Sequence, residues 1–251
     1  MTKWILFSFA LFVPQLIWAA DIQATLQWSH RVELSTPVSG VIKTVDVEVG
    51  GVVRKGQILL SLDTTSFRAR VDERQSEIIR MKAELAEAKR ELDRIQELYE
   101  RTIVSTTDLD QAKLQMVKSQ SKLSEAQARL RQDQQMLVDA SIRAPFDAVV
   151  VIRHAEPGQS VAAGLQPRML LTLARSGEML ARMFLSSSQM DQLKQGQQLT
   201  VRVSDNNYTG NIKTLGMEPI KIKDESVYPV DVIFSIKDPM RAGTPALVSL
   251  P

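Results

Sequence analysis

Two related segments constrain the fold of this 251-residue chain more than any other feature. The stretch "TPVSGVIKTVDVEVGGVVRKG" (36–56) aligns without a gap with "APFDAVVVIRHAEPGQSVAAG" (144–164), at an offset of 144 − 36 = 108 residues. The identical positions are Pro37 and Pro145, Val41 and Val149, Glu48 and Glu156, Gly50 and Gly158, Val53 and Val161, and Gly56 and Gly164. Such a pair indicates either two copies of one domain or two halves of one domain separated by an insertion.

The size of the segments favours two halves. Each contains short apolar strands, "GVIKTVDVEV" and "QILLSL" in the first, "AVVVIRHA" and "RMLLTL" in the second. A segment of about 27 residues cannot bury enough apolar surface to offset its ordering entropy, whereas two that pair face to face can. We therefore predict one small β-sandwich with a pseudo-two-fold axis, built from residues 37–63 and 142–174. Glycines with positive φ are expected in its turns, at Gly40, Gly50, Gly51, Gly56, Gly158 and Gly164.

The insertion, residues 64–141, has the sequence of a helical hairpin. From Phe67 to Ala140 it contains neither Pro nor Gly and is rich in good helix formers. Large side chains recur at intervals of seven, which predicts a coiled-coil seam. The predicted seam residues are Val71, Ile78, Leu85, Leu92, Tyr99, Leu109, Met116, Leu123, Leu130 and Leu137.

The two halves of this series mirror each other, as the arms of an antiparallel hairpin must. Val71 and Leu137 sum to 208, and so does each further pair down to Tyr99 and Leu109, so the tip lies near residue 104. There "TIVSTTD" (102–108) supplies β-branched residues followed by Ser and Thr that can cap the returning helix. Arms of about 35 residues at ~1.5 Å per residue reach roughly 50 Å. The leucines are expected to pack between the arms.

Both ends of the chain differ from this central part. The sequence "MTKWILFSFALFVPQLIWAAD" has one Lys, a short apolar run and small residues, which is the pattern of a signal peptide over residues 1–20, cleaved near Ala19 or Ala20. A retained N-terminal anchor is the alternative. Strands at spacings of about ten residues over 175–251 predict a small antiparallel β-barrel, to which residues 21–36 are expected to contribute. The predicted fold class is α+β, mostly β, and elongated.

Composition and motifs argue against several functional classes. Lys and Arg number 31 against 29 Asp and Glu, so the chain lacks the basic excess of a nucleic-acid-binding protein. It has no Cys and two His residues, His30 and His154, neither at ligand spacing from a partner, so we expect no enzyme activity and no metal site. Met179, Met183 and Met190 form the only soft-ligand group, for which core packing is the favoured interpretation.

The order of these parts resembles the periplasmic adaptor, or membrane fusion protein (HlyD-like), family. The segments "SGVIKTVDVEVGGVVRKGQILLSLD" and "IRAPFDAVVVIRHAEPGQSV" are similar to its two lipoyl-type half motifs. No lipoyl or biotinyl cofactor is expected, because the hairpin takes the place of the exposed turn that would carry the modified lysine. Many members continue into a membrane-proximal domain, but this sequence is expected to end near the closure of the barrel, without a full domain of that kind.

The resemblance implies a role in a tripartite efflux or secretion system. The adaptor would sit in the periplasm, peripheral to the inner membrane, associate into a ring of identical copies, and link an inner-membrane transporter (RND-type expected) to a TolC-like outer-membrane channel. Family members that use such channels carry an Arg, a Leu and a Ser at the hairpin tip, and "RIQELYERTIVS" has Arg94, Leu98 and Ser105 at that spacing. The alternatives are a metal-ion efflux adaptor with a weak Met site and a periplasmic scaffold without transport.

Overall fold

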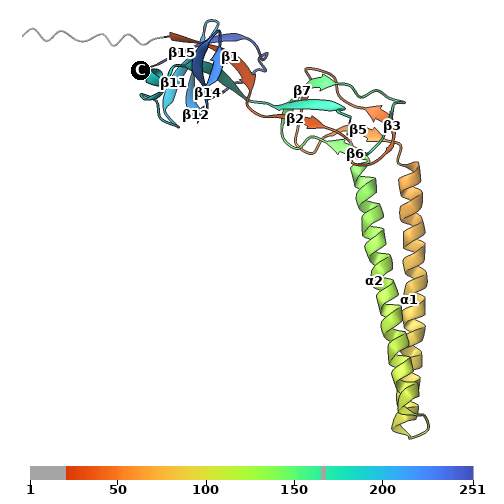
Figure 1. The fold of residues 1–251 in the computed structure, drawn as a ribbon. Helices are drawn as coiled ribbons and strands as arrows, with labels where there is room; N and C mark the ends of the chain where they lie inside the picture. Colours follow the sequence, from red (N-terminus) through yellow and green to blue (C-terminus); the bar gives the residue numbers. More distant parts are fainter. Residues whose placement is uncertain (1–20, 165–167, 251) are drawn as a thin grey trace, which may run out of the picture. The chain divides into compact units, whose positions relative to one another are not determined.

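The computed structural model describes residues 21–164 and 168–250, which divide into two compact units. One unit comprises residues 31–174 and contains the sandwich and the hairpin; the other joins the segment before Arg31 to the segment from Arg175 onward and forms a barrel. The predicted signal peptide, with its cleavage near Ala19 or Ala20, lies outside the described residues. The two units are described separately below (Figure 1).

The sandwich consists of two four-stranded sheets that each contain strands from both halves of the sequence. The first sheet has the order β2 (Arg31–Leu34), β9 (Leu171–Arg175), β7 (Ala148–Arg153) and β4 (Val52–Val53). The second has the order β6 (Ser141–Arg143), β5 (Ile58–Leu62), β3 (Gly40–Val45) and β8 (Ser160–Val161). The 108-residue offset relates β3 to β7 and β4 to β8. Exchanging these two pairs, together with β2 for β6 and β5 for β9, converts one sheet order into the other. The prediction of two halves is confirmed.

Backbone hydrogen bonds repeat this symmetry atom by atom. The Gly50 N–H donates to the Val150 carbonyl at 2.8 Å, and the equivalent Gly158 N–H donates to the Ile42 carbonyl at 2.8 Å. The Ile42 N–H donates to the Gln159 carbonyl and the Val150 N–H donates to the Gly51 carbonyl, both at 2.9 Å. Each half therefore supplies hydrogen-bond partners that the other half needs, so neither forms its turns alone.

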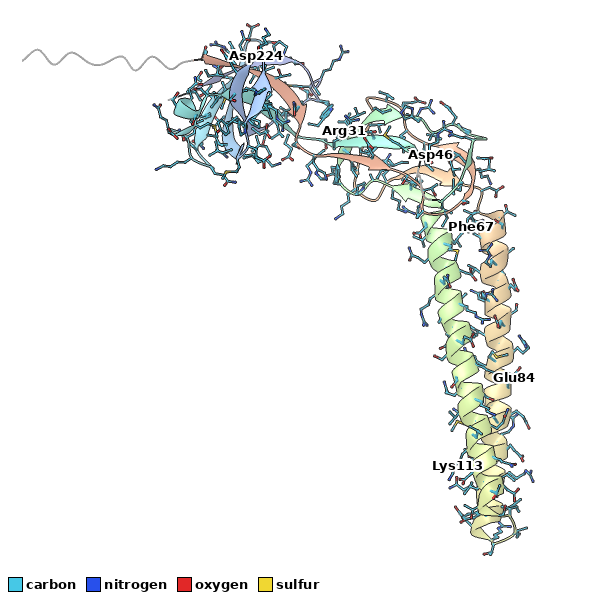
Figure 2. The ribbon with its side chains drawn as sticks, viewed as in Figure 1. Arg31, Asp46, Phe67, Glu84, Lys113 and Asp224 are labelled. Carbon is cyan, nitrogen blue, oxygen red and sulfur yellow. The ribbon has the colours of Figure 1, made fainter. Side chains whose placement is uncertain are left out.

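The sandwich core also anchors both helices of the hairpin. Leu59, Leu60, Leu170 and Leu171 are fully buried in it. Phe67 from the first turns of α1 (Thr65–Glu100) and Ala140 from the end of α2 (Thr106–Asp139) belong to the same cluster. Figure 2 labels Phe67 where α1 leaves the sandwich. Because burying one large apolar side chain contributes about 1.5–3 kcal/mol, this packing fixes the base of the hairpin.

The two helices run antiparallel and pack along the predicted seam (Figure 1). Val71, Leu85, Leu109 and Leu123 are buried. The other seam positions are half-buried, namely Ile78, Leu92, Met116, Leu130 and Leu137. Tyr99 departs from the prediction, because its side chain is 39% exposed and the half-buried residue at that level is Leu98. A straight helix has 3.6 residues per turn, so a strict interval of seven drifts off the seam after several turns.

The seam contains a charged layer near the base that the apolar pattern did not indicate. Asp133 is only 7% exposed, and its Oδ2 accepts a hydrogen bond from Arg74 Nε at 3.0 Å. Arg74 Nη1 also donates to Glu77 Oε2 at 3.0 Å. Hydrogen bonds to Asp133 and then to Glu77 raise the pKa of Arg74. Asp133 stands seven residues after Ala126, in the same row as Ala112 and Ala140, so its position in the seam could have been inferred.

The second unit is a closed antiparallel barrel. Its strand order is β10-β1-β15-β11-β12-β14, and a further pairing of β10 with β14 closes it. The strands are β1 (Asp21–Trp28), β10 (Glu178–Leu185), β11 (Gln198–Val203), β12 (Asn206–Leu215), β14 (Glu225–Ser235) and β15 (Pro245–Ser249). The short α3 (Ser187–Met190) begins with a capping box of Ser186 and Gln189, and β13 (Ile220–Ile222) pairs with β14. The predicted fold class, α+β and mostly β, is confirmed.

Two details of the prediction are wrong. Residues 21–36 do not all belong to the barrel, because β2 pairs with β9 of the sandwich while only β1 joins the barrel. The chain changes unit at the bend Ser29–His30. Among the predicted turn glycines, Gly50, Gly56 and Gly158 have positive φ, but Gly40, Gly51 and Gly164 do not. Gly40 instead lies close to a neighbouring side chain, since an added Cβ would lie 3.2 Å from Leu62 Cδ1.

The symmetry of the sandwich leads to a stability prediction. Gly50 and Gly158 have φ of 86° and 84°, and an added Cβ would meet no atom within 4 Å at either position. The cost of alanine is therefore backbone strain alone, about 1–2 kcal/mol for an L-residue in this region. Gly50→Ala and Gly158→Ala should lower the free energy of unfolding by equal amounts in urea titrations. Gly164→Ala, at ordinary φ in open space, is the control and should change little; unequal costs for the first two would contradict the equivalence of the turns.

Candidate functional site at the hairpin tip

The end of α1 is closed by backbone hydrogen bonds that turn the chain sharply. The Ile103 N–H donates to the Leu98 carbonyl at 3.0 Å and the Thr102 N–H donates to the Tyr99 carbonyl at 2.8 Å, which together form a Schellman motif. Thr102 has a φ of 63°, an unusual conformation for a β-branched residue. The turn is therefore tight even though the sequence supplies no glycine.

The start of α2 is closed by the side chain of Ser105. Its hydroxyl accepts a hydrogen bond from the Asp108 N–H at 3.2 Å and donates to Asp108 Oδ2 at 2.7 Å, while the Ser105 N–H donates to the same carboxylate at 3.0 Å. This is a capping box, as the serine- and threonine-containing break predicts. Hydrogen bonds from the Ser105 side chain and then from its backbone lower the pKa of Asp108. Ser105 thus has a structural role whether or not it contacts a partner.

Arg94 and Leu98 lie one turn apart on α1, at the same end of the hairpin as Ser105. Leu98 is half-buried between the arms. Arg94 is exposed and forms a bidentate pair with Glu91, with Nε–Oε2 at 2.8 Å and Nη2–Oε1 at 2.5 Å. The hydrogen bonds and the charge of Glu91 raise the pKa of Arg94. The guanidinium has five N–H donors, so this pair leaves donors for a further acceptor.

Ile103 is the apolar side chain that the sequence-based assignment of the tip missed. It is 64% exposed in the loop between the helices, where Val104 is half-buried. The signal available in the sequence was its position in "TIVSTTD", outside both heptad series, where no partner in the opposite arm is available to bury it. Together with Leu98 it gives the tip an apolar surface next to a cation.

Metal ligation finds no support in the barrel methionines. Met179 and Met183 are fully buried among apolar side chains of the barrel core, and Met190 packs against the same cluster. This placement matches core packing, the favoured interpretation of these residues. Within residues 21–164 and 168–250, no three His, Cys, Asp or Glu side chains gather in a way that could hold a metal ion. None of the helices in the same described part is long and apolar enough to cross a membrane.

Comparison with known proteins gives a family match and several relatives. Residues 30–166 match the family model of a CzcB-like, barrel-sandwich hybrid domain. Macrolide export protein MacA of Escherichia coli O157:H7 is 28% identical over 216 residues, which cover 79% of this chain and 58% of MacA. Pyoverdine export membrane fusion protein PvdR of Pseudomonas aeruginosa is 29% identical over 219 residues, covering 80% of this chain and 56% of PvdR. The chain thus spans less than two thirds of the length of these relatives.

Solved structures share the same fold. The membrane fusion protein Spr0693 from Streptococcus pneumoniae R6 has a TM-score of 0.71 at 15% identity, over 92% of this chain and 97% of that one. MacA from Actinobacillus actinomycetemcomitans has a TM-score of 0.68 at 20% identity, over 92% of this chain and 78% of its own. At such low identities these matches establish the fold and carry no information on substrate.

The cap at Ser105 provides a test of its structural role. Ser105→Ala should destabilise the tip by about 1 kcal/mol, while Ser105→Asn, which retains a good N-cap, should change it little. Hydrogen exchange of the first amides of α2 measures the difference. Equal exchange in both variants would contradict the capping role.

The Asp108 carboxylate makes the stability of this cap depend on pH, because its pKa lies below the ordinary 3.8. Its contribution to stability is fully present above that value and is lost as the pH falls through the lowered pKa.

Proposed function

The chain belongs to the membrane fusion protein family with a CzcB-like barrel-sandwich hybrid domain, and on that premise we propose that it is a periplasmic adaptor of an efflux or secretion system. In this proposal it is associated with the inner membrane and links an inner-membrane transporter to an outer-membrane channel. The observation that carries the proposal is the hairpin: a coiled coil with a 36-residue α1, anchored in the sandwich core at one end and presenting the exposed Ile103 at the other.

The tip has the chemistry for docking onto a TolC-like channel. Coiled-coil proteins accept apolar side chains in holes between their helices, and the exposed Ile103 beside Leu98 supplies such side chains. Arg94 would add recognition of a carboxylate on the channel. Its pair with Glu91 is exposed and contributes little to stability, so exchanging Glu91 for another carboxylate would cost little. Ser105 would contribute through the shape of the turn that it caps.

A ring of identical copies would surround the transporter in this proposal. The names of the relatives refer to different exported substrates, macrolides for MacA and pyoverdine for PvdR. Neither name specifies an RND-type transporter, and no residue of the described tip or sandwich distinguishes transporter classes. We therefore propose an inner-membrane transporter without assigning its class. Cross-linking from the barrel in cells, followed by identification of the captured membrane protein, assigns the class directly.

The tip assignment predicts a change of binding without a change of folding. Ile103→Asp should abolish capture of the outer-membrane channel in a pull-down, because a carboxylate cannot enter an apolar hole. Ile79→Asp is the matched control, since Ile79 is 70% exposed in the middle of α1, and it should retain capture. Circular dichroism should give the same helix content for both variants. Equal capture by Ile103→Asp and the wild type would refute docking through the tip.

Arg94 is tested by a graded pair of variants. Arg94→Lys keeps the charge but loses the fork geometry, and Arg94→Ala loses both. If Arg94 binds a channel carboxylate, capture should fall in the order wild type, Arg94→Lys, Arg94→Ala, and the loss should shrink at high salt. Identical capture by all three would restrict the contact to the apolar side chains.

The transport role separates this proposal from the rival interpretation of a scaffold protein. Deleting the gene should raise cellular accumulation of at least one exported drug, dye or siderophore. The wild-type chain and Ile79→Asp should restore export, whereas Ile103→Asp should not. Unchanged accumulation across a broad substrate panel in the deletion strain would favour the scaffold.

A further inference from the structure

The outer wall of the barrel carries a groove of about 560 Å³ that the adaptor function does not explain. Its lining comes from four neighbouring strands, β10, β1, β15 and β11. A volume of this size lies within the range of small-molecule sites in proteins. The groove belongs entirely to the barrel unit, so its shape does not depend on the hairpin.

The strand register determines how the lining residues are arranged. Across the groove, Arg202 of β11 lies beside Leu247 of β15. Two residues along, Pro245 of β15 lies beside Thr25 of β1, which in turn lies beside Arg182 of β10. The two arginines are therefore at opposite corners of the lining, three strands and two residues apart. Leu247 and Pro245 form the floor between them.

Each arginine is held in place by a carboxylate that lies outside the groove lining. Arg182 donates from Nε and Nη2 to the two oxygens of Asp231 at 2.7 and 2.8 Å, and Asp231 is only 7% exposed. Arg202 donates from Nη2 to Asp21 Oδ2 at 2.5 Å. The described lining thus contains two cations and no carboxylate. A guanidinium has five N–H donors, so both arginines retain donors for a further anion.

The apolar part of the groove is completed by Phe184. It is 38% exposed and lies two residues beyond Arg182 on the same face of β10. A large aromatic side chain on the solvent face of a barrel strand gains little from the core, but it can cover the apolar body of a ligand. The side chain of Arg202 is the more exposed of the two arginines, at 45% against 34%. An acidic group is therefore best placed at Arg202, with an apolar body extending over Leu247 and Pro245 towards Phe184.

We propose that this groove is a binding site for an amphipathic organic anion, in which Arg202 and Arg182 supply the charge and Leu247, Pro245 and Phe184 the apolar contact. The site goes beyond the adaptor function and does not depend on docking of the hairpin tip. Its ligand class is an acid with an aliphatic or aromatic body, which can be a free organic acid or the anionic head and adjoining chain of a lipid.

Isothermal titration of the purified chain with two probes of equal length tests the charge preference. Decanoate should bind, and decyltrimethylammonium should bind at least tenfold more weakly. Arg202→Gln and Phe184→Ser should each weaken decanoate binding by about tenfold, and Arg241→Gln, which alters an exposed arginine outside the groove lining, should not. Arg182 is left intact, because its removal would leave the buried Asp231 without its partner. Thermal unfolding of each variant checks that the barrel remains folded.

The outcomes divide clearly. No decanoate binding at millimolar concentration, equal affinity for the two probes, or an affinity unchanged by Arg202→Gln and Phe184→Ser would overturn the proposal. The source of the anion follows from sedimentation with vesicles: retention on phosphatidylglycerol but not on phosphatidylcholine, lost in Arg202→Gln, supports a lipid head group. Decanoate binding without vesicle retention supports a free organic acid.

Discussion

The reciprocal hydrogen bonds between Gly50 and Val150, and between Gly158 and Ile42, are the contacts on which the rest of the sandwich–hairpin unit depends. They join two halves that are each too small to fold. The pairing of the two halves also brings the ends of the insertion together. At this point the Leu62 N–H donates to the Ala140 carbonyl at 2.8 Å. A helical hairpin can therefore be inserted at this point without opening the core, and Phe67 and Ala140 extend that core into the hairpin base.

At the opposite end of the hairpin, the backbone groups are already satisfied by the protein itself. The Schellman motif closes α1 and the capping box closes α2. The N–H groups of Thr102, Ile103, Ser105 and Asp108 thus have intramolecular partners. In the proposed docking, the side chains of Ile103, Leu98 and Arg94 would make the contacts with another molecule. Ser105, which was predicted as a contact residue, forms the cap of α2 and would also shape the contact surface in the proposed docking.

Much of the fold was predictable because its signals are local and periodic. The aligned glycines and valines indicated the split sandwich, and the interval of seven indicated the seam. The errors occur where tertiary contacts override such patterns. Gly40 lies in a chain segment packed closely against Leu62, which no local signal reveals, and β2 pairs with β9, about 140 residues later in the chain. The exposure of Ile103 depends on how the chain leaves α1 with Thr102 at positive φ, which a sequence without glycine at that position does not suggest.

The charged layer of Arg74 and Asp133 has a consequence for the length of the molecule's arm. If one helix slid past the other by a heptad, Arg74 would face Ala126 or Ala140, and the nearly buried Asp133 would lose the hydrogen bond that Arg74 Nε donates to it. Apolar layers such as Met81 with Ala126 tolerate such a shift far better. A heptad corresponds to roughly 10 Å along a helix. The ion pair of Arg74 and Asp133 thereby favours one register of the two helices, which fixes the distance of the loop from the sandwich. A component that must span a gap of constant width requires such a fixed distance.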